Sequence, residues 1–159
     1  MTAPENYAFN AQNLGNFPPG VSDWAALQVP LRKQTFTNPA AADADAIKTS
    51  IATTTSTVTY SGADLNGVIG AGAISPPRNI TVTTGGGTAA DAPATATITG
   101  LAIDGSAQTD AITVAQTATI ASGTKAFSSV TSIALTAGQG TDATLTFGTG
   151  AVIGLDSKL

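Results

Sequence analysis

The fold is decided by a run of short segments between residues 76 and 155, which opens with Pro76-Pro77-Arg78-Asn79-Ile80-Thr81-Val82-Thr83-Thr84 and breaks at Gly85-Gly86-Gly87. Apolar residues alternate with threonine or serine through this segment and through later ones. A period of two is the signature of a strand with one buried face. Threonine and valine favour strands because branching at Cβ stiffens the side chain and packs well on a pleated surface. The stretch therefore predicts a β module.

We predict an all-β fold, a β-sandwich or small barrel over about 58–155, with strands near 78–84, 94–101, 110–117, 126–136 and 143–148. Proline cannot donate to a ladder, so Pro76 and Pro77 predict an edge strand or the start of a strand. The residues expected to point inward share apolar side chains on one face of each strand: Ile80, Val82, Ile98, Ile112, Val114, Phe127, Ile133, Leu135, Leu145 and Phe147.

Residues 1–37 are predicted to form an extended N-terminal arm, because they show no helix or strand period and are interrupted by prolines. They hold most of the aromatic residues of the chain. Disordered tails are poor in aromatics, so we expect contact to order the arm, either on its own sheet or on a neighbouring subunit or partner. Aromatic side chains are good anchors, and the candidate partner-binding residues are Tyr7, Phe9, Phe17, Trp24 and Phe36.

Residues 38–75 are predicted to connect this arm to the β module at 76–159. Asn38-Pro39 suits a helix start, and Ile47 and Ile51 are four residues apart, as on one helix face. We therefore predict one short helix that ends near Ile51. A first strand is predicted at 57–60, where apolar and polar residues alternate.

Composition limits the possible functions. Only 10% of residues are charged and 5% are aromatic, so the sheet has a thin core of small side chains, which points to burial against other chains. A net charge of −4 with six basic residues argues against a nucleic-acid partner. The opening residues lack a secretory signal and no stretch is long and apolar enough to span a bilayer, so we expect neither export nor a membrane partner.

No motif predicts an enzyme, a cofactor or a metal site. The chain has no histidine or cysteine, which removes the common catalytic triads and thiolate metal sites. The run 138–143 spells a dinucleotide fingerprint but precedes a strand, so a hairpin turn is the better interpretation. The run 122–125 spells Ser-x-x-Lys and is likewise interpreted as a turn between strands. Two aspartate pairs, Asp43 with Asp45 and Asp104 with Asp110, lack the spacing of an EF-hand.

The β module resembles a module of tailed-bacteriophage structural proteins. The resemblance rests on a succession of turns and strands over about half of the chain: Pro77 to Thr83, Ala90-Asp91, Ala94 to Gly100, Asp104-Gly105, Gly123 to Ile133, Gly138 to Leu145 and Gly154-Leu155, with a weaker part at Tyr60 to Gly67. In size and architecture the chain is similar to capsid decoration (cement) proteins. That resemblance implies a homotrimer on the exterior of the capsid, bound to the major capsid protein.

The leading hypothesis is therefore a virion protein, assembled in the host bacterial cytoplasm, that decorates and stabilises the capsid across capsomers. Another virion part, such as a head fibre base or a tail component, is the second. A bacterial surface adhesin or polysaccharide-binding β domain is the third, and it ordinarily requires an export signal and tandem repeats.

Overall fold

Seven antiparallel strands build the part of the chain that the computed structural model describes, residues 41–154. The strands are β1 (Asp43–Ala52), β2 (Val58–Ser61), β3 (Ala73–Gly86), β4 (Thr95–Leu101), β5 (Ala107–Thr113), β6 (Ile120–Leu135) and β7 (Ala143–Ile153). Two short 3-10 helices, η3 (Gly62–Asp64) and η4 (Ala89–Asp91), lie in the loops after β2 and β3.

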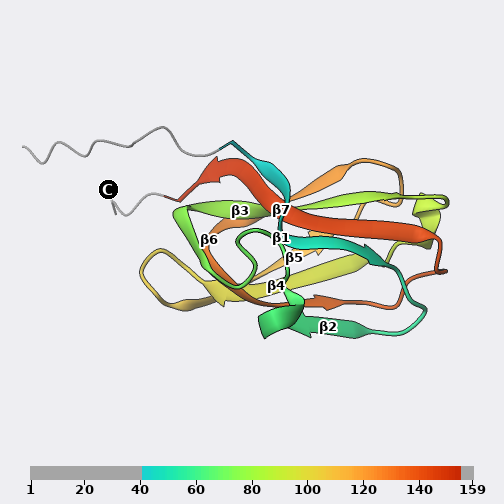
Figure 1. Cartoon of the computed structure of the whole chain (residues 1–159), viewed down its shortest axis with the longest axis horizontal. Coiled ribbons are helices and arrows are strands. Elements are labelled where there is room, and N and C mark those ends of the chain that lie inside the picture. Colours follow the sequence, from blue (N-terminus) through green and yellow to red (C-terminus); the bar gives the residue numbers. More distant parts are fainter. Residues whose placement is uncertain (1–40, 155–159) are drawn as a thin grey trace, which may run out of the picture. The chain divides into compact units, whose positions relative to one another are not determined.

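One sheet with the order β1-β7-β3-β6-β4-β5 contains all of these strands, because β2 also pairs with β6. The N-terminal half of β6 pairs with β3, and its C-terminal half pairs with β2 and β4. We call β1, β7, β3 and the first half of β6 the first layer, and β2, the second half of β6, β4 and β5 the second layer (Figure 1). Both contribute to one buried cluster, so the sheet folds over on itself along β6. The all-β prediction is confirmed, and the sheet is not closed.

The predicted core is confirmed, since all ten residues expected to point inward are buried. Phe127 and Phe147 are the largest side chains that are fully buried. A Cβ on Gly100 of β4 would come within 2.9 Å of Phe127 Cδ1, although Phe127 itself pairs with Arg78 of β3. Phe127 therefore joins the two layers at the fold of the sheet.

The short helix predicted to end near Ile51 is wrong. Residues 43–52 form strand β1, which pairs with β7 at the edge of the first layer. Side chains four residues apart share one face in a strand as well as in a helix. Ile47 is fully buried and Ile51 packs against the core, so the same spacing serves the sheet. Residues 38–40, where the helix is predicted to begin, lie outside the described residues. The sheet includes β1 and β2 from the predicted connecting segment as well as the strands of the predicted β module at 76–159.

Strands β3, β6 and β7 are longer than predicted, whereas β5 begins earlier than predicted and ends at Thr113 instead of 117. β3 is central in the sheet, not an edge. β6 begins six residues before the predicted start at 126, and β7 continues to Ile153. Pro76 and Pro77 lie inside β3, where the pairing with β6 is interrupted between Ala73 and Arg78. The ladder to β7 begins only at Arg78, so neither proline has to donate a hydrogen bond there.

Two segments interpreted as turns have other roles. Ser122 to Lys125 lies within β6, not between strands. The segment 138–142 does join β6 to β7, but these two strands pair with opposite edges of β3, so it is not a hairpin turn. Gly85 and Gly86, at which the alternating pattern breaks in the sequence, are paired with Thr144 and Ala143 of β7. Gly86 has a φ of 91°, which only glycine adopts readily, and this allows β3 to leave the sheet there.

Asn79 organises the irregular part of the first layer. The register shifts on both sides of it, because β6 carries extra residues at 123–125 and β7 carries extra residues at 150–152. The Asn79 amide donates from Nδ2 to Gly123 O over 2.9 Å and accepts at Oδ1 from Val152 N over 3.0 Å. A Cβ on Gly150 would overlap this amide, so glycine is needed beside it. One buried side chain thereby gives a hydrogen-bond partner to a backbone carbonyl in the bulge of β6 and to a backbone N–H in the bulge of β7.

Asp110 links β5 to the first half of β6 without a ladder between them. Its carboxylate Oδ2 accepts hydrogen bonds from Thr124 N over 2.8 Å and from Lys125 N over 3.1 Å. In return, Lys125 Nζ donates to Thr109 O. These contacts tie the free edge of the second layer to the bulge of the first layer, which brings the open sheet close to a barrel.

Candidate functional site

The partner-binding residues predicted from the sequence, Tyr7, Phe9, Phe17, Trp24 and Phe36, lie outside the described residues. Their role stays a prediction. Within residues 41–154, the candidates for a site are the aspartate pairs, the hollow beside β2 and the exposed faces of the sheet.

Neither aspartate pair forms a group that could hold a metal ion among residues 41–154. Asp104 Oδ1 accepts hydrogen bonds from the hydroxyl and the backbone N of Ser106, and Asp110 bonds the bulge of β6. Asp43 Oδ1 accepts from Asp45 N over 3.2 Å. The hydrogen bond between the two carboxyl groups, and then the charge of Asp43, raise the pKa of the exposed Asp45. These aspartates hold turns and bulges in place.

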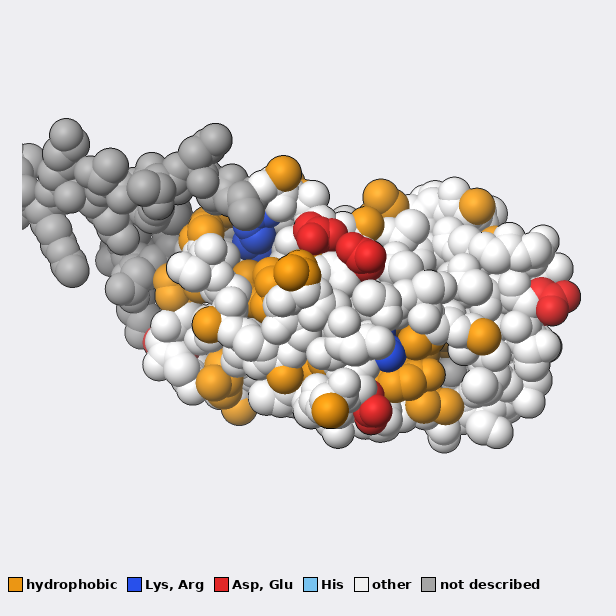
Figure 2. Space-filling view, viewed as in Figure 1, with side chains coloured by type: hydrophobic (Ala, Val, Ile, Leu, Met, Phe, Trp, Pro, Cys, Tyr) orange, Lys and Arg blue, Asp and Glu red, His pale blue; other side chains and the backbone are white. Residues whose placement is uncertain are grey.

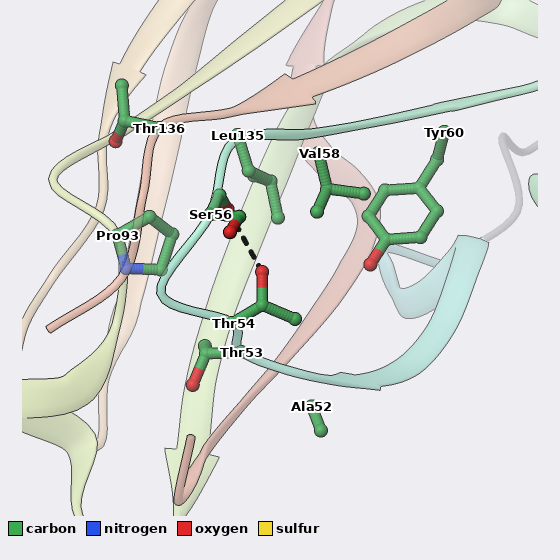
Figure 3. A pocket seen from close by; sticks show the side chains of 9 residues that line it. All are labelled: Ala52, Thr53, Thr54, Ser56, Val58, Tyr60, Pro93, Leu135 and Thr136. Atoms are coloured by element: carbon green, nitrogen blue, oxygen red, sulfur yellow. Dashed lines mark hydrogen bonds between the residues drawn. The ribbon is translucent and has the colours of Figure 1, made fainter. Parts of the chain in front are cut away.

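A shallow hollow lies between the end of β1, β2 and the end of β6 (Figure 3). It is lined by Ala52, Thr53, Thr54, Ser56, Val58, Tyr60, Pro93, Leu135 and Thr136. Thr54 Oγ1 donates to Ser56 O over 2.9 Å and fixes the rim. The free volume is about 10 Å³, which suits one water molecule, whereas small-molecule sites ordinarily have about 300–1,000 Å³. This hollow is too small for a substrate.

The loop between β2 and β3 covers part of the edge of β1. Asn66 Oδ1 accepts hydrogen bonds from Lys48 Nζ over 3.2 Å and from Thr49 Oγ1 over 2.9 Å, and Gly67 N donates to Ile47 O. Lys48 Nζ also lies 5.0 Å from the centroid of the Tyr60 ring, within the range of a cation–π contact. Burial, and then the negative charge of Asp64, raise the pKa of Tyr60. The loop blunts an edge that would otherwise be open to another strand.

The outer side of the second layer is a surface of short side chains that spans four strands. Its side chains alternate with buried ones along each strand, as the burial pattern of β4 and β5 shows. We call it the threonine face, and it consists of Thr59, Ser61, Thr95, Thr97, Thr99, Leu101, Ala107, Thr109, Ala111, Thr113, Ser132 and Ala134.

The strand registers align this face in rows. Thr99 is paired with Thr109 on one side and with Ser132 on the other, and Ser132 is paired with Ser61. The next row contains Thr97 with its neighbours Ala111 and Ala134. Neighbouring strands lie about 4.8 Å apart, and side chains two residues apart on a strand share a face. Short side chains therefore repeat across four strands at regular intervals.

The residues of the threonine face are themselves uncharged, but the ammonium of Lys125 reaches its β5 edge and donates to Thr109 O. Leu101, 37% exposed, is the one large apolar side chain of the face. On the side of the molecule that Figure 2 draws, charged side chains are few, and two acidic groups lie next to each other. The alternation of threonine along 95–99 is visible in the sequence, but only the pairing of four strands turns it into a continuous surface.

No protein family model, curated protein or solved structure matches this chain. Within residues 41–154, no helix is long and apolar enough to cross a membrane.

Proposed function

We propose that this chain is a structural virion protein that decorates a bacteriophage capsid and stabilises it by binding the major capsid protein across capsomers. The observation that carries the proposal is the antiparallel β domain of small residues with one core, in which the hollow at β2 has room for about one water molecule. Such a domain is suited to a role as a rigid surface component. The resemblance of the turn-and-strand pattern to phage structural proteins also supports a role on the capsid.

The residues proposed to bind the shell are the aromatic side chains of the arm, Tyr7, Phe9, Phe17, Trp24 and Phe36. Interfaces draw most of their energy from a few buried aromatic and arginine anchors. In this proposal the arm binds the major capsid protein, and the β domain lies on the exterior of the particle. Association of the β domains into a homotrimer is part of the proposal, and assembly takes place in the host bacterial cytoplasm.

Co-sedimentation with undecorated capsids tests this function. The full chain is expected to sediment with the shells, and Trp24→Ala is expected to weaken binding by about 2 kcal/mol or more, roughly a 30-fold change in Kd. A chain that starts near residue 38 is expected to bind much more weakly while it keeps its β circular-dichroism signal. Val68→Ala is the control, because Val68 is an apolar side chain of the β domain that is 84% exposed.

Failure of the full chain to bind undecorated capsids would contradict the proposal. Equal binding by the full chain and the shortened chain would remove the arm as the clamp. If the purified chain instead bound tail structures or bacterial polysaccharide, the function would be that of another virion part or of an adhesin.

A further inference from the structure

We propose that the seam between β5 and the first half of β6 is a latch, which Asp110 holds closed and which opens while the first layer stays folded. Three side chains cross the seam: those of Gln108 and Asp110 from β5 and that of Lys125 from β6. The inference goes beyond the proposed function, because it concerns a motion within the β domain and does not depend on a capsid.

The seam is held by side chains, whereas the rest of the sheet is held by ladders. Asp110 Oδ2 accepts hydrogen bonds from Thr124 N over 2.8 Å and from Lys125 N over 3.1 Å. Among residues 41–154, no backbone pairing joins β5 to β6, and β5 is the last strand in the sheet order. By contrast, β3 is paired with β7 without a break from Ile80 to Gly86. Parting the seam therefore breaks a few side-chain bonds and leaves the β4–β5 ladder intact.

The bulge of β6 is shaped to receive the Asp110 carboxylate. The pairing of β6 with β3 skips residues 123–125, so their backbone groups have no ladder partner on β3. A Cβ on Gly123 would come within 2.5 Å of Asp110 Oδ2 and within 3.1 Å of Ile112 Cδ1. Glycine at this position therefore leaves room for the carboxylate and for the buried isoleucine beside it.

Little apolar burial holds β5 against the first layer. Ile112 is the only buried apolar side chain within β5, and the other buried position of this strand belongs to Asp110, which is 8% exposed. A buried carboxylate loses its hydration, and this cost offsets much of the gain from its two hydrogen bonds. Water can bond to the carboxylate again once the seam parts. Because few apolar contacts are lost on opening, the seam has the features of a local opening site, and Asp110 fixes where β5 closes.

Thiol labelling of single-cysteine variants of the full chain tests the latch, since the chain has no cysteine of its own. Ile112→Cys places the thiol beneath the seam. The matched control is Val82→Cys, because Val82 is fully buried in β3 and is paired with both β6 and β7. Each labelling rate under native conditions is compared with the rate that global unfolding of the same variant allows, measured with a denaturant. Ile112→Cys is expected to label at least tenfold faster than this limit, and Val82→Cys is expected to label at it.

Variants of the seam assign the latch to Asp110. Asp110→Ala removes the acceptor and Gly123→Ala places a methyl group against the carboxylate, so each is expected to raise the labelling of Ile112→Cys at least tenfold. Neither is expected to raise the labelling of Val82→Cys by more than its loss of global stability explains. Asp64→Ala removes an exposed carboxylate in η3 and is the charge-matched control, which is expected to leave the excess labelling of Ile112→Cys unchanged.

Circular dichroism identifies variants that do not fold. If Asp110→Ala is one of them, Gly123→Ala carries the comparison, and the comparison of the two cysteine variants needs neither. Labelling of Ile112→Cys at the global rate would overturn the latch. An equal rise at both thiols in the seam variants, or no rise beneath the seam in Asp110→Ala, would overturn it as well.

Discussion

The two layers of the sheet use the same small residues in different ways. The first layer is irregular: its ladders shift register around Asn79, and buried polar groups satisfy the bulges from within. The second layer is more regular: β4 and β5 keep one register over seven pairs, from Thr95 with Thr113 to Leu101 with Ala107, and the β4–β6 ladder shifts register once, between Thr99 and Gly100. In the first layer, the bulges bond to polar side chains inside the domain, whereas in the second layer the short side chains of β4 and β5 remain on the outer face. The difference teaches that the surface available to a partner depends on strand register more than on composition.

The largest expected effect comes from the core that both layers share. Phe147→Ala in β7 is expected to lower the free energy of unfolding by about 3–5 kcal/mol, because it removes a fully buried ring. Phe127→Ala in β6 is expected to cost about as much, since its ring joins the layers. Chemical denaturation with both variants measures this, and Thr146→Ala serves as the control. A loss below about 1 kcal/mol for Phe127 would show that the layers do not share one core.

A smaller effect tests the polar centre of the first layer. Asn79→Ala leaves the buried Gly123 O and the part-buried Val152 N without their partner. An unsatisfied buried group costs about 1–3 kcal/mol and a partly exposed one costs less, so we expect a loss of about 2–4 kcal/mol. Thr97→Ala on the outer face of the second layer is expected to cost less than about 1 kcal/mol. Equal losses in urea unfolding would contradict the contrast between an internally bonded layer and a layer with a free face.

The smallest effect concerns pH at the edge of the second layer. Folding raises the pKa of Tyr60 above the ordinary value of about 10, chiefly through burial and then through the charge of Asp64. The folded state therefore favours the protonated phenol. The resulting stability is present below about pH 10 and is lost as the pH rises through the folded pKa. Thermal unfolding from pH 8 to 11 should show a decline that is reduced in Tyr60→Phe, and an unchanged decline would exclude Tyr60 as its cause.

The local alternation of residues predicts much of this fold. Each strand of the β module is visible as threonine or serine beside an apolar residue, and the ten predicted core residues are all buried. The helix predicted to end near Ile51 is wrong because apolar residues four positions apart share one face in a helix and in a strand alike. Residues 43–52 form a strand because they pair with β7. The bulge of β6 could not be predicted either, because the local sequence at 122–125 is typical of a turn. Hydrogen bonds of Gly123 and Thr124 with the distant residues Asn79 and Asp110 keep this segment within β6.

The sequence by itself determined the all-β class, the inward side of the five strands predicted between 78 and 148, and the shortage of charge. These follow from side-chain period and composition, which act within a few residues of one another. Tertiary structure alone decided that β6 serves both layers, that β3 is central despite its two prolines, and that the threonines of β4 and β5 and the small residues of β2 and β6 form one face. Such outcomes depend on which distant strands pair, and a pattern with a period of two is the same for every partner strand.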